Sequence, residues 1–238
     1  MKNEKDIEDY LDGEKNVEEV NWLWKEDGLH TDWHDNGEKK LEVTYKNGKP
    51  EGLGTGWHDN GQKQSEINFK NGQADGLMIA WHENGKKECE ATFKDGKKDG
   101  LRTEWHKNGK KKRKSTFKDG KEDGLVIAWY ENGQKECEAT LKSGEADGLL
   151  TFWYENGQKQ SESTNKDGKL DGLLTFWYEN GQKQREITVK GEKEDGLVTD
   201  WHDNGQKVYE GTYKDGEKIS SKCWDENGNE MECPPQKK

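Results

Sequence analysis

The stretch that decides the fold is Asp171–Gly181, which reads DGLLTFWYENG. Its pattern returns along nearly the whole chain, with a tryptophan every 24 residues and Asn-Gly three residues after each tryptophan. Self-similarity at a fixed period of about 20 to 50 residues is the signature of a repeat protein. The eight tryptophans of the series are Trp33, Trp57, Trp81, Trp105, Trp129, Trp153, Trp177 and Trp201.

Each repeat is predicted to form one β-hairpin. Leu77, Ile79 and Trp81 alternate with other residues, which is the period of a β-strand. The Asn-Gly of 84–85 then turns the chain, because glycine readily adopts positive φ and asparagine tolerates it. A second alternating segment follows, and a further Asp-Gly turn leads into the next repeat. The sequence therefore predicts an all-β fold, an elongated single twisted antiparallel sheet of tandem 24-residue hairpins.

The loop length predicts which residues share a face. A three-residue Glu-Asn-Gly loop, with Gly85 as a bulge residue, pairs His82 with Lys86. Because a slip of one residue moves every side chain to the other face, we prefer this register, which gathers the apolar residues together. We expect the core on the face of the tryptophans. In the third repeat this face is predicted to hold Leu77, Ile79, Trp81, Cys89, Ala91 and Phe93.

The composition is unusual for a folded chain. Of 238 residues only 27% are apolar, 37% are charged, and the net charge is −11. Such values are typical of disordered chains, but a repeat array needs no large globular core, because each repeat covers only its neighbours. The chain has no run of apolar residues long enough for membrane insertion. The first residues lack the apolar region of a secretory signal, so we expect a cytoplasmic protein.

The ends of the chain depart from the repeat. Residues 1–21 are acidic and are expected to form an N-terminal cap or a disordered segment. Ile7, Tyr10 and Leu11 have helical spacing, and the alternation of 20–24 predicts a strand over the first hairpin. The array spans 22–228, and 229–238 is a polar tail whose two prolines disfavour strand pairing.

The four cysteines do not indicate a disulfide framework. Cys89 and Cys137 occupy the same position two repeats apart, which is about 19 Å across four strands and beyond the reach of a disulfide. Cys223 and Cys233 are close enough in sequence to form a disulfide, and the sequence is equally consistent with two free thiols. The cysteines therefore fit a reducing compartment.

The repeat resembles a known unit. The unit reads Trp or Tyr, two residues, Asn-Gly, then Lys, Glu, an aromatic residue, Lys-Asn/Asp-Gly-Lys and x-Gly-Leu. It is complete at 81–101 and recurs at 129–149 with Leu141, Ser143 and Glu145 in place of the aromatic residue, the Asn/Asp and the second Lys. This pattern resembles the variant MORN repeat, over about four fifths of the chain. Arrays of this kind are similar to the bacterial YwqK-type family, and the resemblance implies an antitoxin or immunity protein. The classical MORN repeat has Tyr and Gly-rich strands where this chain has Trp, Thr and Glu, which disfavours the lipid-binding role of eukaryotic MORN proteins.

Catalysis and metal binding are not expected. Successive histidines at the position after the tryptophan lie about 9.6 Å apart, whereas a zinc ion binds its nitrogen ligands at about 2 Å. Catalysis needs a unique pocket, but an array repeats each acidic side chain. We therefore predict no catalytic residue, no cofactor and no metal site. The histidines in question are His34, His58, His82, His106 and His202.

The face opposite the tryptophans carries the candidate binding site. It is polar in most repeats, as at Glu104 and Asp200, but apolar in three adjacent ones. Exposed apolar patches flanked by charge usually mark interaction surfaces; the alternative is that this stripe packs as core. Three glutamates of the paired strands are expected on the same face. The predicted partner-binding residues are Val126, Tyr130, Leu150, Phe152, Tyr154, Leu174, Phe176 and Tyr178, with Glu138, Glu162 and Glu186.

The charge indicates the kind of partner. A net charge of −11 favours a basic protein and disfavours nucleic acid and anionic lipid. The expected function is a protein-binding repeat array, an antitoxin or immunity-type protein that captures and occludes a toxin or other basic protein. The alternative is a structural or cell-surface scaffold array with no dedicated ligand. The sequence carries no signal for an oligomeric state.

Overall fold

The computed structural model describes residues 26–234. The chain divides into two compact units, unit 1 up to Lys121 and unit 2 from Glu122, which we treat separately. Within the described residues every element is a strand and every strand pairing is antiparallel, so the prediction of an all-β array of tandem hairpins is confirmed. The N-terminal cap or disordered segment predicted for 1–21, and the strand predicted for 20–24, lie outside the described residues.

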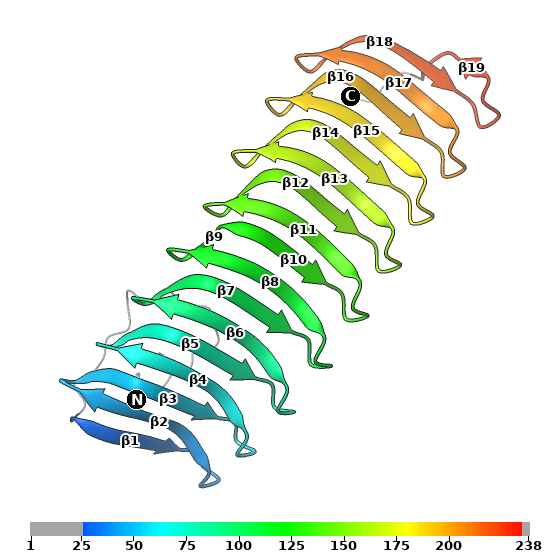
Figure 1. Cartoon of the computed structure of the whole chain (residues 1–238). Coiled ribbons are helices and arrows are strands. Elements are labelled where there is room, and N and C mark those ends of the chain that lie inside the picture. Colours follow the sequence, from blue (N-terminus) through cyan, green and yellow to red (C-terminus); the bar gives the residue numbers. More distant parts are fainter. Residues whose placement is uncertain (1–25, 235–238) are drawn as a thin grey trace. The chain divides into compact units, whose positions relative to one another are not determined.

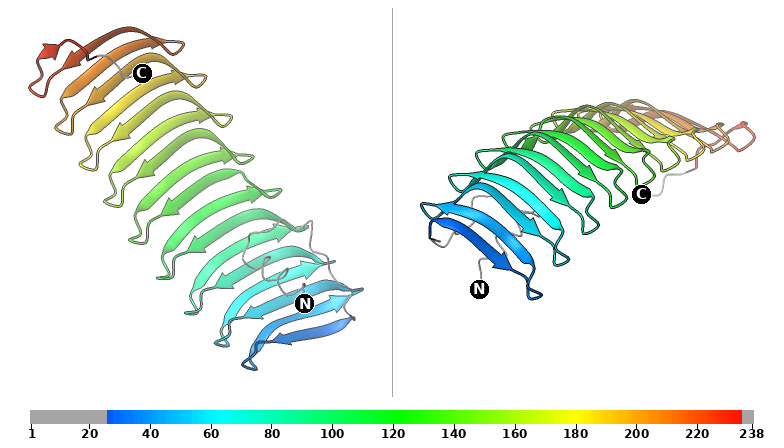
Figure 2. Two further views of the ribbon diagram at one scale, coloured as in Figure 1. Left: turned by 180° about the vertical axis from the view of Figure 1, so that it is seen from behind. Right: turned by 60° about the horizontal axis from the view of Figure 1, so that its bottom comes forward.

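Within each unit, consecutive strands lie side by side in one layer (Figures 1 and 2). Unit 1 holds β1 (Gly28–Trp33), β2 (Lys39–Lys46), β3 (Lys49–Trp57), β4 (Lys63–Lys70), β5 (Gln73–Trp81), β6 (Lys87–Lys94), β7 (Lys97–Trp105) and β8 (Lys111–Lys118). Unit 2 holds β10 (Gly124–Trp129), β11 (Lys135–Lys142), β12 (Glu145–Trp153), β13 (Lys159–Lys166), β14 (Lys169–Trp177), β15 (Lys183–Lys190), β16 (Lys193–Trp201), β17 (Lys207–Lys214), β18 (Glu217–Trp224) and β19 (Glu230–Met231). The short β9 (Lys121–Glu122) falls at the division.

Two kinds of turn alternate along each unit. At the tryptophan end, the His82 amide donates a hydrogen bond to the Lys86 carbonyl at 2.9 Å, which closes the predicted three-residue loop. At the other end, Asp95 and Gly96 adopt φ of 48° and 79°. Positive φ at both central residues is typical of a two-residue type I′ turn. The three-residue loop inferred at Asn-Gly is therefore correct, and the Asp-Gly turn lies where it was predicted.

A β-bulge directly after the three-residue loop changes the register. Trp81 pairs with Lys87, but Ala80 pairs with Cys89, so Glu88 is an extra residue on β6. The same irregularity lies beside the tryptophan in the eight hairpins from β1–β2 to β16–β17. Because side chains alternate along a strand, one extra residue moves the rest of the second strand to the opposite face from the one predicted.

The core therefore lies on the face opposite the tryptophans, which we call the core face, and the predicted tryptophan-side core is wrong. Cys89, Ala91 and Phe93 share the core face with Met78 and Ala80. In unit 1 the buried residues are Val43, Tyr45, Ile67, Phe69, Ala74, Met78, Ala80, Cys89, Ala91 and Phe93. In unit 2 they include Val126, Ala139, Ile187, Val189 and Val198.

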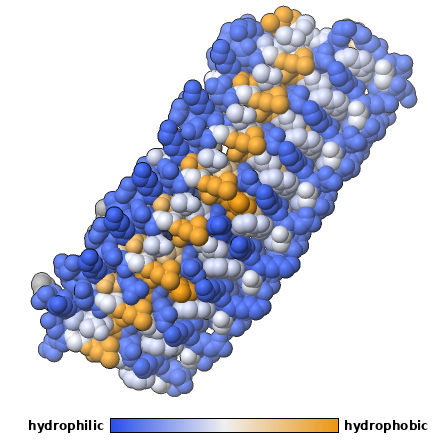
Figure 3. Space-filling view, in the orientation of Figure 1, coloured by the Kyte–Doolittle hydropathy of each residue, from blue (hydrophilic) through white to orange (hydrophobic). Residues whose placement is uncertain are grey.

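The other face, which we call the tryptophan face, exposes its leucines to solvent, although the threonines between the leucines and the tryptophans, such as Thr151, are buried. Figure 3 shows an apolar row on it in each unit. The row consists of leucines from the Asp-Gly-Leu motif, each 43% or more exposed. Their exposure is a second departure from the predicted core, which included them. They are Leu29, Leu53, Leu77 and Leu101 in unit 1 and Leu125, Leu149, Leu173 and Leu197 in unit 2.

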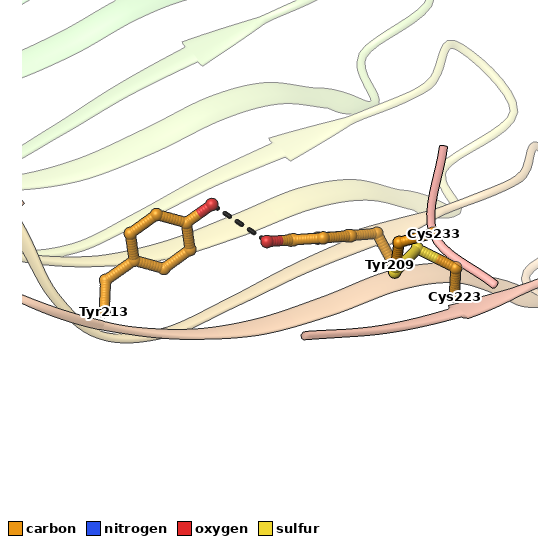
Figure 4. Close-up of a disulfide and its surroundings, with 4 residues drawn as sticks. All are labelled: Tyr209, Tyr213, Cys223 and Cys233. Carbon is orange, nitrogen blue, oxygen red and sulfur yellow. Dashed lines mark hydrogen bonds between the residues drawn. A yellow bond between two sulfur atoms is a disulfide. The ribbon is translucent and has the colours of Figure 1, made fainter. Parts of the chain in front are cut away.

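A disulfide joins β18 to the residues that follow β19. Cys223 on β18 is bonded to Cys233, with the Cα atoms 5.1 Å apart (Figure 4). Beside it, the hydroxyls of Tyr209 and Tyr213 lie 2.8 Å apart in a hydrogen bond. Burial, more than this bond, raises the pKa of Tyr209. The segment expected to be an unpaired tail thus contributes β19 and a covalent link.

We expect Cys233→Ser to loosen β19 without unfolding unit 2. β19 makes two residue pairs with β18, and closing a loop of this size stabilises a fold by about 2 to 3 kcal/mol. Hydrogen exchange should accelerate at 229–233 and stay unchanged at β14 and β15. Dithiothreitol should produce the same change in the natural chain and none in the variant. Unchanged exchange at 229–233 would show that the disulfide does not hold β19.

Candidate protein-binding surface

The predicted apolar stripe lies on the core face of unit 2, on β10, β12 and β14. Its residues differ in burial: Val126 is 4% exposed and belongs to the core, whereas Phe152 is 37% exposed. Leu150, Leu174 and Phe176 are half-buried. The stripe is therefore partly core and partly open surface, and the open part centres on Phe152.

Small residues between the strands leave the two phenylalanines accessible. Ser161 on β13 pairs with Phe152 on one side and with Phe176 on the other. In the next row Ser163 separates Leu150 from Leu174 in the same way. Directly opposed side chains on neighbouring strands lie about 5 Å apart. A serine at that distance covers little of an aromatic ring, so the side of each ring that faces Ser161 remains available to a partner.

A charged cluster bounds the stripe on β15 and β16. Arg185, which pairs with Phe176, has its Nη2 atom 3.5 Å from Glu194 Oε1 and its Nε atom 3.6 Å from Asp200 Oδ1. Burial, the largest influence, raises the pKa of Asp200, and Arg185 opposes that shift. Polar residues thus flank the apolar stripe, which is the arrangement of a protein-binding patch with a polar rim.

The three tyrosines of the predicted site connect neighbouring repeats. The hydroxyl of Tyr154 donates a hydrogen bond to the Trp177 carbonyl at 2.8 Å, and Tyr130 and Tyr178 bond Trp153 and Trp201 in the same way at 2.6 and 2.9 Å. Burial is the largest influence that raises the pKa of Tyr130 and of Tyr154. The tyrosines therefore act as struts between repeats.

Histidine takes the same structural role in unit 1. The Nε2 atoms of His34, His58 and His82 lie 2.8, 2.8 and 3.1 Å from the backbone carbonyls of Trp57, Trp81 and Trp105. This role had not been inferred from the sequence. Among the described residues, no group of three His, Cys, Asp or Glu side chains is arranged to hold a metal ion.

We expect Tyr154→Phe to destabilise unit 2 by about 1 kcal/mol, because it removes one hydrogen bond and leaves the Trp177 carbonyl without its donor. Urea unfolding followed by circular dichroism measures this loss. Tyr154→His is the matched control, since histidine makes the same contact in unit 1, and it should restore most of the stability. Equal stability of the natural chain and the Phe variant would argue against the strut.

The three glutamates of the predicted site lie on the tryptophan face, so their expected position beside the phenylalanines is wrong. The bulge residues Glu136, Gln160 and Gln184 cause this inversion. Glu162 pairs with Thr151 and forms an ion pair with Lys159 at 2.5 Å. Glu138 and Glu186 make the equivalent ion pairs, each at 2.5 Å, with Lys135 and Lys183.

The lysines of these ion pairs also cover the tryptophans. Lys159 Nζ lies 5.4 Å from the centroid of the Trp177 ring, a cation–π distance. The tryptophan face thus repeats one arrangement, in which a lysine covers a tryptophan and forms an ion pair with a glutamate of its own strand. The glutamates are therefore already paired within the sheet. The other such pairs are Lys39 with Trp57, Lys87 with Trp105, Lys135 with Trp153, Lys183 with Trp201 and Lys207 with Trp224.

The negative charge is concentrated in the unit that carries the stripe. Residues 122–238 contain 25 Asp and Glu against 15 Lys and Arg, a net charge of −10. Residues 1–121 contain 25 acidic and 24 basic residues, a net charge of −1, and include the basic segment 107–114. The field around the stripe is therefore strongly negative.

Acidic residues at the turns of unit 1 have a structural role. Asp95, Asp99 and Asp119 line a shallow recess with Lys94, Lys97 and Gln73. The carboxylate of Asp99 accepts a hydrogen bond from the Asp119 amide at 3.3 Å, and Asp75 accepts one from the Asp95 amide at the same distance. These contacts stabilise the turns.

The fold and this surface define a β-hairpin repeat protein whose units each carry a polar and an apolar face. The chain belongs to the MORN repeat variant family, whose model matches eight consecutive segments. A search of curated proteins finds no match. Proteins of this family are typically non-enzymatic scaffolds, and their arrays commonly bind proteins or membranes. Residues 26–234 contain no helix with the length and apolar character of a membrane span. The matched segments are 26–47, 50–71, 74–95, 98–119, 122–143, 146–167, 170–190 and 194–215.

Proposed function

We propose that this chain binds a basic protein through the core face of unit 2. The observation that supports the proposal is the exposed Phe152 beside the half-buried Phe176, on a unit of net charge −10. Unpartnered aromatic side chains with a polar rim are typical of binding hot spots. Val126 is buried and supports the surface from within, and the tyrosine struts fix the strands that carry it.

The apolar and charged groups have different tasks in this binding. The rings of Phe152 and Phe176, with Leu150 and Leu174, bury apolar area against the partner and so account for most of the affinity. The acidic field accelerates association with a basic partner and makes the rate depend on salt. The ion-paired glutamates of the tryptophan face contribute to this field from a distance and make no contact at the stripe.

The particular function that we favour is that of an antitoxin or immunity-type protein in the cytoplasm. In such a protein the core face of unit 2 would cover the active surface of a basic toxin and block it by steric occlusion. The leucine rows of the tryptophan face favour a second candidate, a scaffold array, because the same exposed row recurs in both units. The acidic charge disfavours anionic membranes as the ligand.

Affinity capture with the immobilised chain tests the proposal. Extracts of the source organism are passed over the natural chain and over the Phe152→Glu/Phe176→Glu variant at about 50 and 500 mM salt, where exposed charges are weakly and strongly screened. We expect basic proteins on the natural chain at low salt, far less at high salt, and little on the variant. Retention by both chains alike would contradict the proposed surface.

Co-expression separates the two candidate functions. A captured toxin should arrest growth when produced alone, and the natural chain, but not the variant, should relieve the arrest. A captured protein that has no effect on growth would favour the scaffold function.

A further inference from the structure

One heptapeptide occurs twice in the chain with the same loop but different side-chain contacts. The sequence Trp-His-Asp-Asn-Gly-Gln-Lys stands at 57–63 and again at 201–207. In both copies the glycine amide donates a hydrogen bond to the histidine carbonyl, at 3.0 Å in the first and 2.9 Å in the second. The asparagine is exposed in both. Any difference between the two asparagine side chains therefore comes from what lies beyond the heptapeptide.

In the first copy the asparagine side chain is held at both of its polar atoms. Asn60 Nδ2 donates a hydrogen bond to the Glu83 carbonyl of the next repeat at 3.1 Å, and Asn60 Oδ1 accepts one from the Gln62 amide at 2.9 Å. The side chain therefore cannot rotate without losing two hydrogen bonds. The same contact with the next repeat is made by Asn36, Asn84, Asn132, Asn156 and Asn180.

In the second copy the contact with the next repeat is missing. Asn204 Oδ1 accepts a hydrogen bond from the Gln206 amide at 2.9 Å, but within residues 26–234 no acceptor faces Asn204 Nδ2. The cause lies in the sequence. Trp224 follows Trp201 by 23 residues, whereas the other tryptophans of the series are 24 residues apart. The carbonyls of the last hairpin are therefore displaced from the positions that the asparagine would reach.

The neighbouring histidine shows the same loss. His58 Nε2 lies 2.8 Å from the Trp81 carbonyl. His202 Nε2 is buried and has no hydrogen-bond partner among the described residues. Two side chains of the second heptapeptide thus lack their contacts with the next repeat, which is the result expected from a shortened repeat and not from a local change at Asn204.

We propose that Asn204-Gly205 is a site of deamidation, the reaction that converts asparagine into an acidic residue. Glycine favours this reaction, because it has no Cβ to shield its amide nitrogen. The Gly205 nitrogen loses its proton and attacks Cγ of Asn204. The new N–Cγ bond closes a succinimide ring, the Cγ–Nδ2 bond breaks, and Nδ2 leaves as ammonia. Water then opens the ring to aspartate or isoaspartate and is the only co-reactant.

The hydrogen bonds of the side chain control the rate of this reaction. The attack requires the asparagine side chain to rotate until Cγ meets the glycine nitrogen. Rotation breaks two hydrogen bonds at Asn60 and one at Asn204. Each hydrogen bond that must break reduces the population of reactive conformers several-fold. Because both asparagines are exposed, access of water does not distinguish them, and the contact with the next repeat does.

The modification changes the charge of the array without breaking a contact between repeats. Conversion of Asn204 to aspartate adds one negative charge to unit 2, whose net charge is −10, and Asn204 Oδ1 can still accept its hydrogen bond. The same conversion at Asn60 would remove the donor to Glu83. The chain thus protects the asparagines that join repeats and exposes one that does not. This inference does not depend on the partner proposed for unit 2.

The experiment follows deamidation of the full natural chain by mass spectrometry after digestion. The two heptapeptides are distinguished by the residues before them, 50–56 and 194–200. The chain is incubated for several weeks in neutral buffer, folded and in concentrated urea. In urea both asparagines should react at the same rate, because their neighbours are the same. In the folded chain Asn204 should react several-fold faster than Asn60.

Ile219→Asp-Gly is the matched variant. It restores the 24-residue spacing and the Asp-Gly of the other repeats, keeps Cys223, and removes a side chain that is 66% exposed. Asn204 should then gain its contact with the next repeat and react as slowly as Asn60. Circular dichroism checks that the variant is folded. If it is not, the comparison of the folded and urea-treated natural chain decides by itself.

Three results would overturn the inference. Equal rates at the two asparagines of the folded natural chain would mean that the contact with the next repeat gives no protection. An unmodified Asn204 over a period in which the urea-treated chain reacts would mean that its remaining hydrogen bonds suffice. A folded Ile219→Asp-Gly variant in which Asn204 still reacts several-fold faster than Asn60 would show that the shortened repeat is not the cause.

Discussion

Ile67→Asp is expected to destabilise unit 1 by at least about 3 kcal/mol, whereas Leu53→Asp should change its stability by less than about 1 kcal/mol. Ile67 on β4 is 2% exposed and pairs with Gly54 and Met78 on the core face. A carboxylate there has no partner and loses its hydration, so the chain must unfold locally or protonate it. Leu53 is 52% exposed on the tryptophan face, where a carboxylate stays in water.

The two variants are matched, because each places the same charge on adjacent strands of one hairpin. Urea unfolding followed by circular dichroism, with tryptophan fluorescence as a second probe, measures both. If the tryptophan face held the core, as in the register without the bulge, Leu53→Asp would be the more damaging change. Equal losses would show that both faces are packed.

The second large effect is expected at the proposed binding surface. Phe152→Glu with Phe176→Glu should weaken partner binding by about 2 kcal/mol or more, roughly thirtyfold. Stability should fall by less than about 1 kcal/mol, because Phe152 is 37% exposed and the same repeat position carries Glu104 and Asp200 elsewhere in the array. Calorimetric titration with the captured partner measures the affinity, and the melting curve measures the stability.

Leu149→Glu with Leu173→Glu is the control for charge. It adds the same two charges to the same strands, β12 and β14, but on the tryptophan face. This control should bind the partner as the natural chain does. A stability loss of several kcal/mol in the phenylalanine variant would mean that the stripe is core. A loss of binding in the leucine variant would mean that the partner binds the tryptophan face, which would contradict the proposed site.

Periodicity alone was sufficient to predict the hairpins, their turns and the antiparallel pairing, but not the faces. Lys87 and Glu88 are both polar, so the strand reads alike with or without a bulge between them and Cys89. Packing across strands, where large residues lie against small ones, shows which face is buried. A Cβ atom on Gly54 would lie 2.8 Å from a ring atom of Phe69, a size match that would have indicated the core face.

The same bulge explains which parts of the binding site were predictable. Phe152 and Phe176 lie on the first strand of their hairpins, before the extra residue, so their position opposite the tryptophans was inferred correctly. Glu162 lies on the second strand, after it, and was placed on the wrong face. The tyrosine struts were missed because their acceptors are backbone carbonyls in the next repeat, and no residue type marks such a partner.

The choice of backbone acceptors has an evolutionary consequence. Tyr154 and the side chain of Asn156 each bond a main-chain oxygen 23 residues further on, at Trp177 and Glu179. A main-chain oxygen is present whatever side chain occupies the position, so a newly copied repeat finds its acceptors without compensating substitutions. The identical stretches 147–160 and 171–184 have the form of such a copying event. An array joined in this way can gain or lose whole repeats by recombination, and its length can change faster than its surface chemistry.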